Sequence, residues 1–142
     1  MNNKEKIYFD TAPFIYFIEN NPEFYQKLED LIFQLVEDES ILYTSVLTQT
    51  EFSVHPIKFD RRELIDDYET MLLTMSFNIN SIDIHIAKQA AELRAKYPSL
   101  KTLDALQLAS ALTFECDKFI TNDRGLSRID ENSMTIVIVA DL

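Results

Sequence analysis

The chain has 142 residues, a net charge of −11, one cysteine and one glycine. This length and a hydrophobic content of 46% suit one packed domain, which we expect to span residues 1–142. Because Cys116 is the only cysteine, the chain cannot form an internal disulfide. Because Gly125 is the only glycine, the chain cannot contain the glycine-rich loops of Rossmann and P-loop nucleotide sites. No apolar run exceeds five residues and the N-terminus is polar, which predicts a cytoplasmic protein without a membrane span or signal peptide.

The charge is unevenly distributed along the chain. Residues 88–128 hold seven basic and five acidic residues, a net charge of +2, whereas the remainder carries −13. Because nonspecific binding to nucleic acid depends on basic surface, we do not expect the whole chain to bind polyanions indiscriminately. The basic segment could form one face that accepts a polyanion, and an ordinary solvated surface is the alternative.

Apolar periodicity predicts strands that alternate with helices. In chain order, we expect a strand at 7–9, helices at 13–19 and 22–38, and a strand at 41–43. A helix that Ser45 caps follows and stops before His55 and Pro56, and after it come a helix at 61–75 and a strand at 77–80. The rest of the chain predicts a helix at 84–97, a helix that Thr102 caps, and strands at 118–121 and 135–139. Strands separated by helices favour a parallel sheet with helices on both faces. The predicted fold class is therefore α/β, a three-layer α/β/α sandwich.

Four carboxylates lie where a parallel sheet places its chemistry. In open parallel sheets, sites form beyond the carboxyl ends of the strands, where the strand order reverses. Asp10 ends the first strand and Asp123 follows the fourth. Glu51 lies in the helix after the second strand, and Asp104 lies in the first turn of an apolar helix. If the first and fourth strands are neighbours, these side chains converge.

Each of these carboxylates also has a structural explanation. Asp10 and Asp123 could be turn or cap residues, and Asp104 could stabilise the start of its helix by about 0.3–1 kcal/mol. Glu51 is harder to explain in this way, because it is the only charged residue between positions 41 and 54. Burying such a carboxylate is costly unless a positive group meets it.

Converging carboxylates repel one another unless protons or cations bind them. Mg²⁺ and Mn²⁺ accept carboxylate oxygens, keep several waters and bind phosphate oxygens. Such ions activate water and neutralise the leaving oxygen of a phosphodiester. The chemistry that the four residues imply is metal-dependent hydrolysis of a phosphodiester bond.

Four segments resemble the motifs of the PIN-domain family, in the family's order. They are Tyr8–Ala12, Ser45–Glu51, Leu103–Ala109 and Thr121–Arg124. The resemblance spans Ile7–Val139, and a short domain of this kind is most similar to VapC-type toxins. It implies a five-stranded parallel sheet of order 3-2-1-4-5 and an Mg²⁺- or Mn²⁺-dependent endoribonuclease, the toxin of a type II toxin–antitoxin pair. It also implies a homodimer and a small antitoxin protein as partner.

The match carries functional residues over to this chain. Asp10, Glu51, Asp104 and Asp123 would be the catalytic and metal-binding carboxylates. Thr11, Thr121 and Asn122 would support the site through hydroxyl and amide groups. Many relatives have a further acidic residue after the fourth motif, where this chain has Gly125 and Leu126. The candidate RNA-binding residues are Arg94, Lys96, Lys101, Arg124 and Arg128, from the basic segment.

Two other functions are alternatives to the ribonuclease. A phosphotransferase of the haloacid-dehalogenase type also places an aspartate after the first strand, but it needs a second aspartate where this chain has Ala12. The other alternative is a non-catalytic PIN-like module that binds RNA or protein. The presence of all four carboxylates speaks against that alternative.

Overall fold

One five-stranded sheet organises the structure, a computed structural model that describes residues 4–142. Its strand order is β3-β2-β1-β4-β5, and all four neighbouring pairs are parallel. The predicted fold class and the strand order 3-2-1-4-5 are therefore confirmed. The strands are β1 (Lys6–Phe9), β2 (Ile41–Ser45), β3 (Asn78–Asn80), β4 (Lys118–Thr121) and β5 (Thr135–Ile138).

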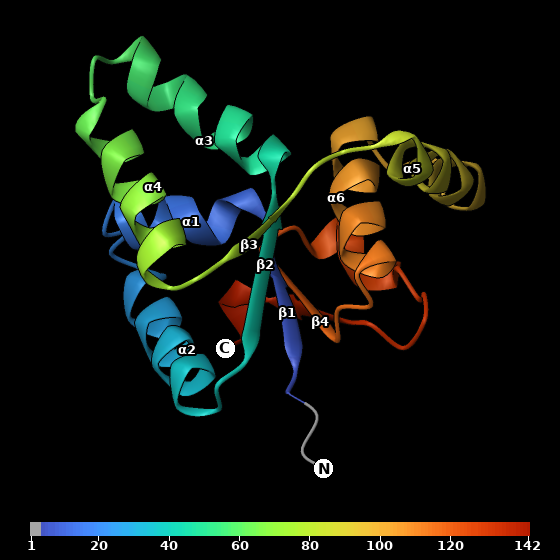
Figure 1. The fold of residues 1–142 in the computed structure, drawn as a ribbon, viewed down its shortest axis with the longest axis horizontal. Helices are drawn as coiled ribbons and strands as arrows, with labels where there is room; N and C mark the ends of the chain where they lie inside the picture. Colours follow the sequence, from blue (N-terminus) through green and yellow to red (C-terminus); the bar gives the residue numbers. More distant parts are fainter. Residues whose placement is uncertain (1–3) are drawn as a thin grey trace.

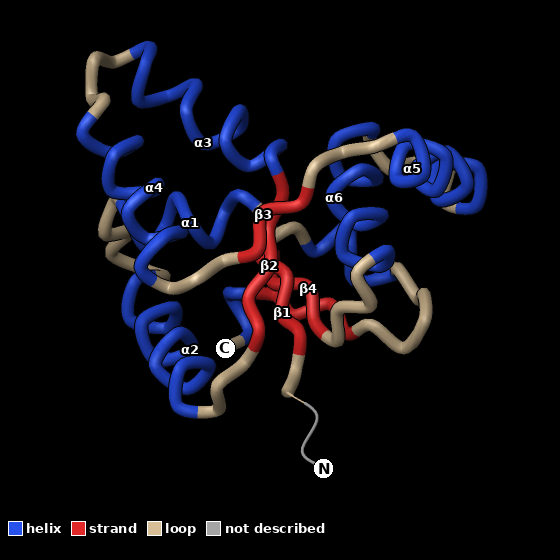
Figure 2. The backbone as a smooth tube through the Cα atoms, viewed as in Figure 1, coloured by secondary structure: helices blue, strands red, loops and turns tan. Residues whose placement is uncertain are grey.

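Helices form the two outer layers, which Figures 1 and 2 show on either side of the sheet seen from its edge. Four helices cover one face: α1 (Thr11–Ile18), α2 (Tyr25–Glu37), α3 (Val46–Lys58) and α4 (Glu63–Thr74). Two helices cover the other: α5 (Ile84–Lys96) and α6 (Thr102–Thr113). Two short 3₁₀ helices, η1 (Arg124–Arg128) and η2 (Val139–Asp141), follow β4 and β5.

The central strand β1 divides the apolar core in two. Ile7 and Phe9 pack against the α1–α4 layer, where Phe9 lies against Phe14 with ring centres 5.4 Å apart. Tyr8 faces the α5–α6 layer and stacks on Phe119 at 5.2 Å. A strand that is buried on both faces carries a continuous apolar sequence, which explains why β1 could be recognised as a short apolar run.

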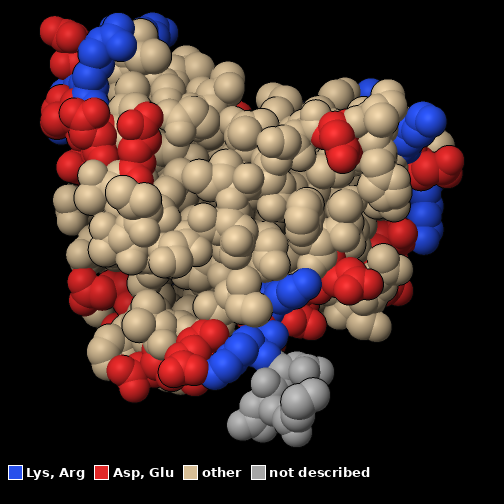
Figure 3. All heavy atoms as spheres, viewed as in Figure 1, with Lys and Arg blue, Asp and Glu red and all other residues tan. Residues whose placement is uncertain are grey.

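Because all four neighbouring pairs are parallel, the five strands end at the same edge of the sheet; Figure 1 shows β2 running upward to this edge and into α3. The chain leaves β1 toward β2 on one side and reaches β4 on the other, so the strand order reverses beside β1. The segments that follow β1, β2 and β4 are α1, α3 and η1. Figure 3 shows a hollow at this end of the molecule, between the part formed by α3 and the part formed by α5 and α6.

The helix α3 is longer than the sequence predicts, because it continues past His55 and Pro56 to Lys58. A proline inside a helix cannot donate a backbone hydrogen bond. Here its ring is buried, and the helix is closed beyond it by hydrogen bonds from Phe59 N to the carbonyl of His55 at 3.0 Å and from Arg61 N to that of Pro56 at 2.7 Å. Tertiary packing therefore outweighs the local cost.

The starts of α2 and α6 also differ from the prediction. The helix α2 begins at Tyr25 rather than at residue 22, because the Asn21 side chain accepts hydrogen bonds from Glu23 N and Phe24 N and holds a turn there. Thr102 is the first residue of α6 and not its cap. Its hydroxyl instead accepts a hydrogen bond from the Arg94 guanidinium at 2.9 Å.

None of the helices within residues 4–142 is both long enough and apolar enough to cross a membrane.

Candidate functional site

Asp10 lies directly after β1 and caps the N-terminus of α1. One carboxylate oxygen accepts a hydrogen bond from Thr11 N at 2.8 Å, and the other accepts one from the Thr121 hydroxyl at 2.8 Å. The pKa of Asp10 is raised to about 6, mainly by burial and further by the negative charges of Glu51 and Asp104, although the two hydrogen-bond donors lower it. Asp10 is therefore a helix cap, which is the structural role that the sequence also allows, and it is a member of a charged cluster as well.

Glu51 reaches the same place from α3. Its side chain is half-buried, and its Oε1 accepts hydrogen bonds from the Thr11 hydroxyl at 2.8 Å and from Gln107 Nε2 at 3.0 Å. Within residues 4–142 no cation pairs with this carboxylate, and the two neutral donors leave its negative charge uncompensated.

Asp104 and Asp123 complete the cluster from the α6 side. Asp104 is half-buried in the first turn of α6. Burial raises its pKa, the charges of Asp123 and Glu51 raise it further, and Lys101 lowers it. Asp123 is exposed, and its carboxylate caps η1 by accepting a hydrogen bond from Gly125 N at 2.9 Å.

Gly125 leaves the room that Asp123 occupies. A Cβ at position 125 would lie 3.0 Å from Asp123 Oδ1, which is tighter than ordinary van der Waals contact. The single glycine of the chain is therefore explained by the close approach of this carboxylate to the backbone.

The three supporting residues are placed differently from one another. The Thr121 hydroxyl lies between two carboxylate-bearing segments, since it donates to Asp10 and accepts from Asp123 N at 3.2 Å. Thr11 donates its hydroxyl to Glu51 rather than to Asp10. Asn122 does not face the cluster: it donates to the Tyr16 hydroxyl at 3.2 Å and accepts from the backbone of η2 at 3.0 Å. Its role in the structure is to fix the segment after β5.

Most of the candidate RNA-binding residues already have partners. Arg124 makes a two-pronged ion pair with Asp141, at 3.0 and 2.7 Å. Lys96 pairs with Glu131, Arg94 donates to the Leu100 carbonyl and Thr102, and Arg128 donates to the Gly125 carbonyl and to Ser99. Within residues 4–142, Lys101 has no ion pair, and it is the cation whose charge reaches Asp104.

Gln107 is a residue that the sequence analysis did not single out. It contacts Glu51 and is almost completely buried in α6. A signal was present, because Gln107 is the one polar residue besides Asp104 between positions 103 and 109, and a spacing of three places both on one side of the helix.

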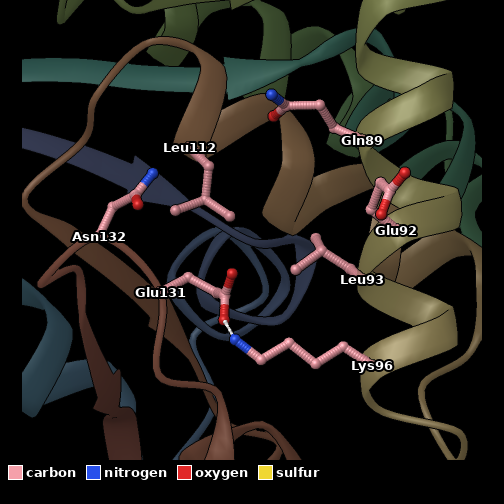
Figure 4. A pocket seen from close by; sticks show the side chains of 7 residues that line it. All are labelled: Gln89, Glu92, Leu93, Lys96, Leu112, Glu131 and Asn132. Carbon is pink, nitrogen blue, oxygen red and sulfur yellow. Dashed lines mark hydrogen bonds and ion pairs between the residues drawn. The ribbon is translucent and has the colours of Figure 1, made fainter.

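The cavity in Figure 4 is separate from the carboxylates. It has a volume of about 290 Å³ and lies beside α5, the end of α6 and the segment before β5, where Glu131 pairs with Lys96. None of the four candidate catalytic residues lines it.

The sequence profile of the PIN domain family matches residues 7–132. The chain belongs to this family. No curated protein sequence matches it significantly.

Three solved structures show that this PIN domain has the fold of toxins from toxin–antitoxin pairs. A toxin–antitoxin complex from Klebsiella pneumoniae is 24% identical, with a TM-score of 0.66 over 94% of this chain and 97% of that one. VapBC2 from Rickettsia felis, bound to a DNA fragment from its promoter, is 17% identical, with a TM-score of 0.71 over 92% and 96%. VapC20 from Mycobacterium tuberculosis, a toxin that cleaves the sarcin–ricin loop, is 12% identical, with a TM-score of 0.65 over 89% and 92%.

The donor set of this PIN domain fits a hard divalent cation. The charges of Glu51 and Asp104 act on Asp10, and those of Asp123 and Glu51 act on Asp104, while the protein supplies neutral donors and Lys101 rather than a set of matching cations. As the side chains stand within residues 4–142, no three Asp, Glu, His or Cys residues already enclose a metal position. Mg²⁺ typically binds through one or two carboxylates and keeps several waters, so it does not require such a cage.

The raised pKa of Asp10 predicts a pH dependence of stability in EDTA. The folded protein binds this proton with a pKa of about 6, against an ordinary value of 3.8. Asp10 therefore favours the folded state below about pH 4, and this contribution is lost as the pH rises through about 6. Asp10→Asn is neutral and can still cap α1, so urea unfolding should show it gaining on the order of 1–3 kcal/mol relative to wild type between about pH 4 and pH 7. Parallel pH profiles of the two proteins would contradict the shift.

Proposed function

We propose that this PIN domain is a metal-dependent endoribonuclease that hydrolyses RNA phosphodiester bonds. The observation that carries the proposal is the meeting of Asp10, Glu51, Asp104 and Asp123 at the edge of the sheet where the strand order reverses. Each comes from a different segment, and the protein leaves their charge largely uncompensated. Such a set has no evident purpose in stability, since like charges that are brought together destabilise the fold.

The four carboxylates would hold Mg²⁺ or Mn²⁺. The bound ion would activate water and neutralise charge on the scissile phosphate. Asp10 and Glu51 are fixed by hydrogen bonds from Thr11, Thr121 and Gln107, so their orientation is set before any substrate arrives. Asp123 is the exposed member, which suits it to the side from which RNA approaches.

The RNA would run past the start of α6 and η1. The candidate contacts are Arg94, Lys101, Arg124 and Arg128, with Lys96 farther along α5. These residues bear positive charge beside a negative site, which would steer a phosphate backbone toward the carboxylates in a protein whose net charge is −11. Lys101 is the sharpest candidate because it lies next to Asp104 and has no competing ion pair among the described residues.

The chain would act as the toxin of a type II toxin–antitoxin pair, silenced by a small antitoxin. The Klebsiella and Rickettsia structures with this fold are toxin–antitoxin assemblies, which supports such a partner.

We also propose a homodimer. Figure 3 shows a face around β3 that is largely free of charge, and Leu73, Ile79 and Ile84 are exposed apolar residues of α4, β3 and α5. Two copies that each carry a charge of −11 can approach most easily through such a face.

The non-catalytic binding module remains the competing function. It would use the same fold and the same basic residues, but it would not need the charged cluster. A cleavage assay decides between the two functions. A nuclease cuts RNA in the presence of Mg²⁺ and stops when EDTA is added, whereas a binding module retains RNA without cutting it.

Asp104→Asn should separate catalysis from stabilisation of the start of α6, in whose first turn Asp104 lies. If Asp104 binds metal, the variant should lose RNA cleavage by about a hundredfold or more, while its stability without metal equals or exceeds that of wild type. Mg²⁺ at ten times its Kd should stabilise wild type by about 1.4 kcal/mol, or roughly 4–5 °C in Tm, and the variant much less. Thermal melts with and without Mg²⁺, together with a cleavage assay, give both readouts.

Asp83→Asn is the matched control for this experiment. Asp83 caps α5 by accepting a hydrogen bond from Ile86 N at 2.9 Å, and it is not among the charges that act on the site. Its variant should cut RNA and respond to Mg²⁺ as wild type does. An Asp104→Asn protein that melts lower in both conditions yet still cuts RNA would show that Asp104 serves only its helix.

The basic face predicts a change in the salt dependence of RNA binding. In EDTA, the double variant Lys101→Ala, Arg124→Ala should bind a labelled single-stranded RNA more weakly than wild type. Its slope of log K against log salt should be shallower by roughly 1, because one or two phosphate contacts are lost. Lys58→Ala, Arg61→Ala removes the same charge from the end of α3 and the segment before α4 and should leave the slope unchanged. Equal slopes for all three proteins would exclude this face as the RNA-binding surface.

A further inference from the structure

Gln107 occupies the centre of a buried polar cluster at the carboxyl end of the sheet. Its side chain is 1% exposed, and it reaches out of α6 toward β1, β2 and α3. Its carboxamide oxygen accepts hydrogen bonds from the hydroxyls of Tyr8 and Ser45, the latter at 3.2 Å. Its nitrogen donates to Glu51 Oε1 at 3.0 Å. One neutral side chain thus connects the α5–α6 layer with a carboxylate of the α1–α4 layer.

The neighbours of Gln107 allow only one orientation of its carboxamide. If its oxygen faced Glu51, two acceptors would lie side by side, whereas the NH₂ group can donate to the carboxylate. The oxygen must then face Tyr8 and Ser45, which both have a hydroxyl proton to give. The Ser45 oxygen already accepts a hydrogen bond from Leu47 N at 3.3 Å, so its own proton is free for Gln107.

We propose that Gln107 is a positioning residue of the nuclease site, an inference that rests on the proposed function. Gln107 and Thr11 both donate to the same oxygen of Glu51. Within residues 4–142 no other group donates a hydrogen bond to this carboxylate, which leaves Oε2 for a partner from outside. Gln107 therefore fixes the direction in which Glu51 presents its second oxygen to the metal.

A neutral donor suits this task better than a lysine or an arginine. A cation in contact with Glu51 would neutralise the charge that a divalent ion needs and would compete with the ion for the same oxygens. The carboxamide gives Glu51 a direction and leaves its charge unchanged. Residues that orient metal ligands in this way typically contribute 10–100-fold to metal affinity or activity.

Gln107→Met tests the proposal, because methionine keeps the length and unbranched shape of glutamine but cannot donate a hydrogen bond. We expect the Mn²⁺ affinity of the variant, measured by titration calorimetry without RNA, to fall about tenfold or more. In the cleavage assay, kcat should fall by a similar factor, while KM for RNA changes little. Circular dichroism establishes that the variant is folded.

Ser110→Ala is the matched structural control. Ser110 is fully buried on the same helix and accepts a hydrogen bond from Asn80 Nδ2 at 2.9 Å, but it does not contact Glu51. This variant should lose stability and keep the Mn²⁺ affinity of wild type. A role of Gln107 in folding alone predicts that the two variants behave alike.

A folded Gln107→Met protein that binds Mn²⁺ as tightly as wild type would overturn the proposal. If that variant does not fold, Gln107→Asn provides the same test, because an amide one methylene shorter cannot contact Tyr8 and Glu51 together. A wild-type protein that neither binds Mn²⁺ nor cuts RNA would contradict the proposed function and this inference together. A functional wild type with an unaffected variant contradicts the positioning role alone.

Discussion

Repulsion between carboxylates is the constraint on which the rest of the structure depends. Parallel pairing of β1 with both β2 and β4 brings Asp10, Glu51 and Asp123 to one edge, and α6 adds Asp104. The fold does not relieve this repulsion with matching cations. Hydroxyl, amide and backbone N–H donors fix the side chains and leave most of the negative charge in place, and burial and mutual repulsion raise the pKa of Asp10 and Asp104.

The same donors connect the site to the framework of the domain. The Thr121 hydroxyl ties the end of β4 to Asp10 at the end of β1, and the Gln107 carboxamide ties α6 to Glu51 on α3. A displacement of either helical layer against the sheet would therefore misplace a carboxylate. This coupling explains why a small chain keeps fully buried polar residues such as Thr121 next to an otherwise apolar core.

The sequence predicted the architecture well because its signals are local. The short apolar strands that end at Asp10 or lead to Asp123 can be recognised from the sequence. The strand order followed from the resemblance to the PIN family. The features that the sequence did not reveal depend on contacts between distant parts of the chain. Asn122 turns toward the segment after β5, α3 passes through Pro56, and Gln107 meets Glu51 across 56 residues. Local propensity cannot reveal such contacts, because tertiary packing determines them.

The proposed metal site, in which carboxylates from separate segments hold a divalent ion, is tested most directly by crystals of the wild-type protein with Mn²⁺, measured near the manganese absorption edge. We predict an anomalous peak in contact with the Asp10 carboxylate and at least one of Glu51, Asp104 and Asp123. At saturating Mn²⁺, the absence of a peak at this edge of the sheet, or a peak only elsewhere, would contradict the account.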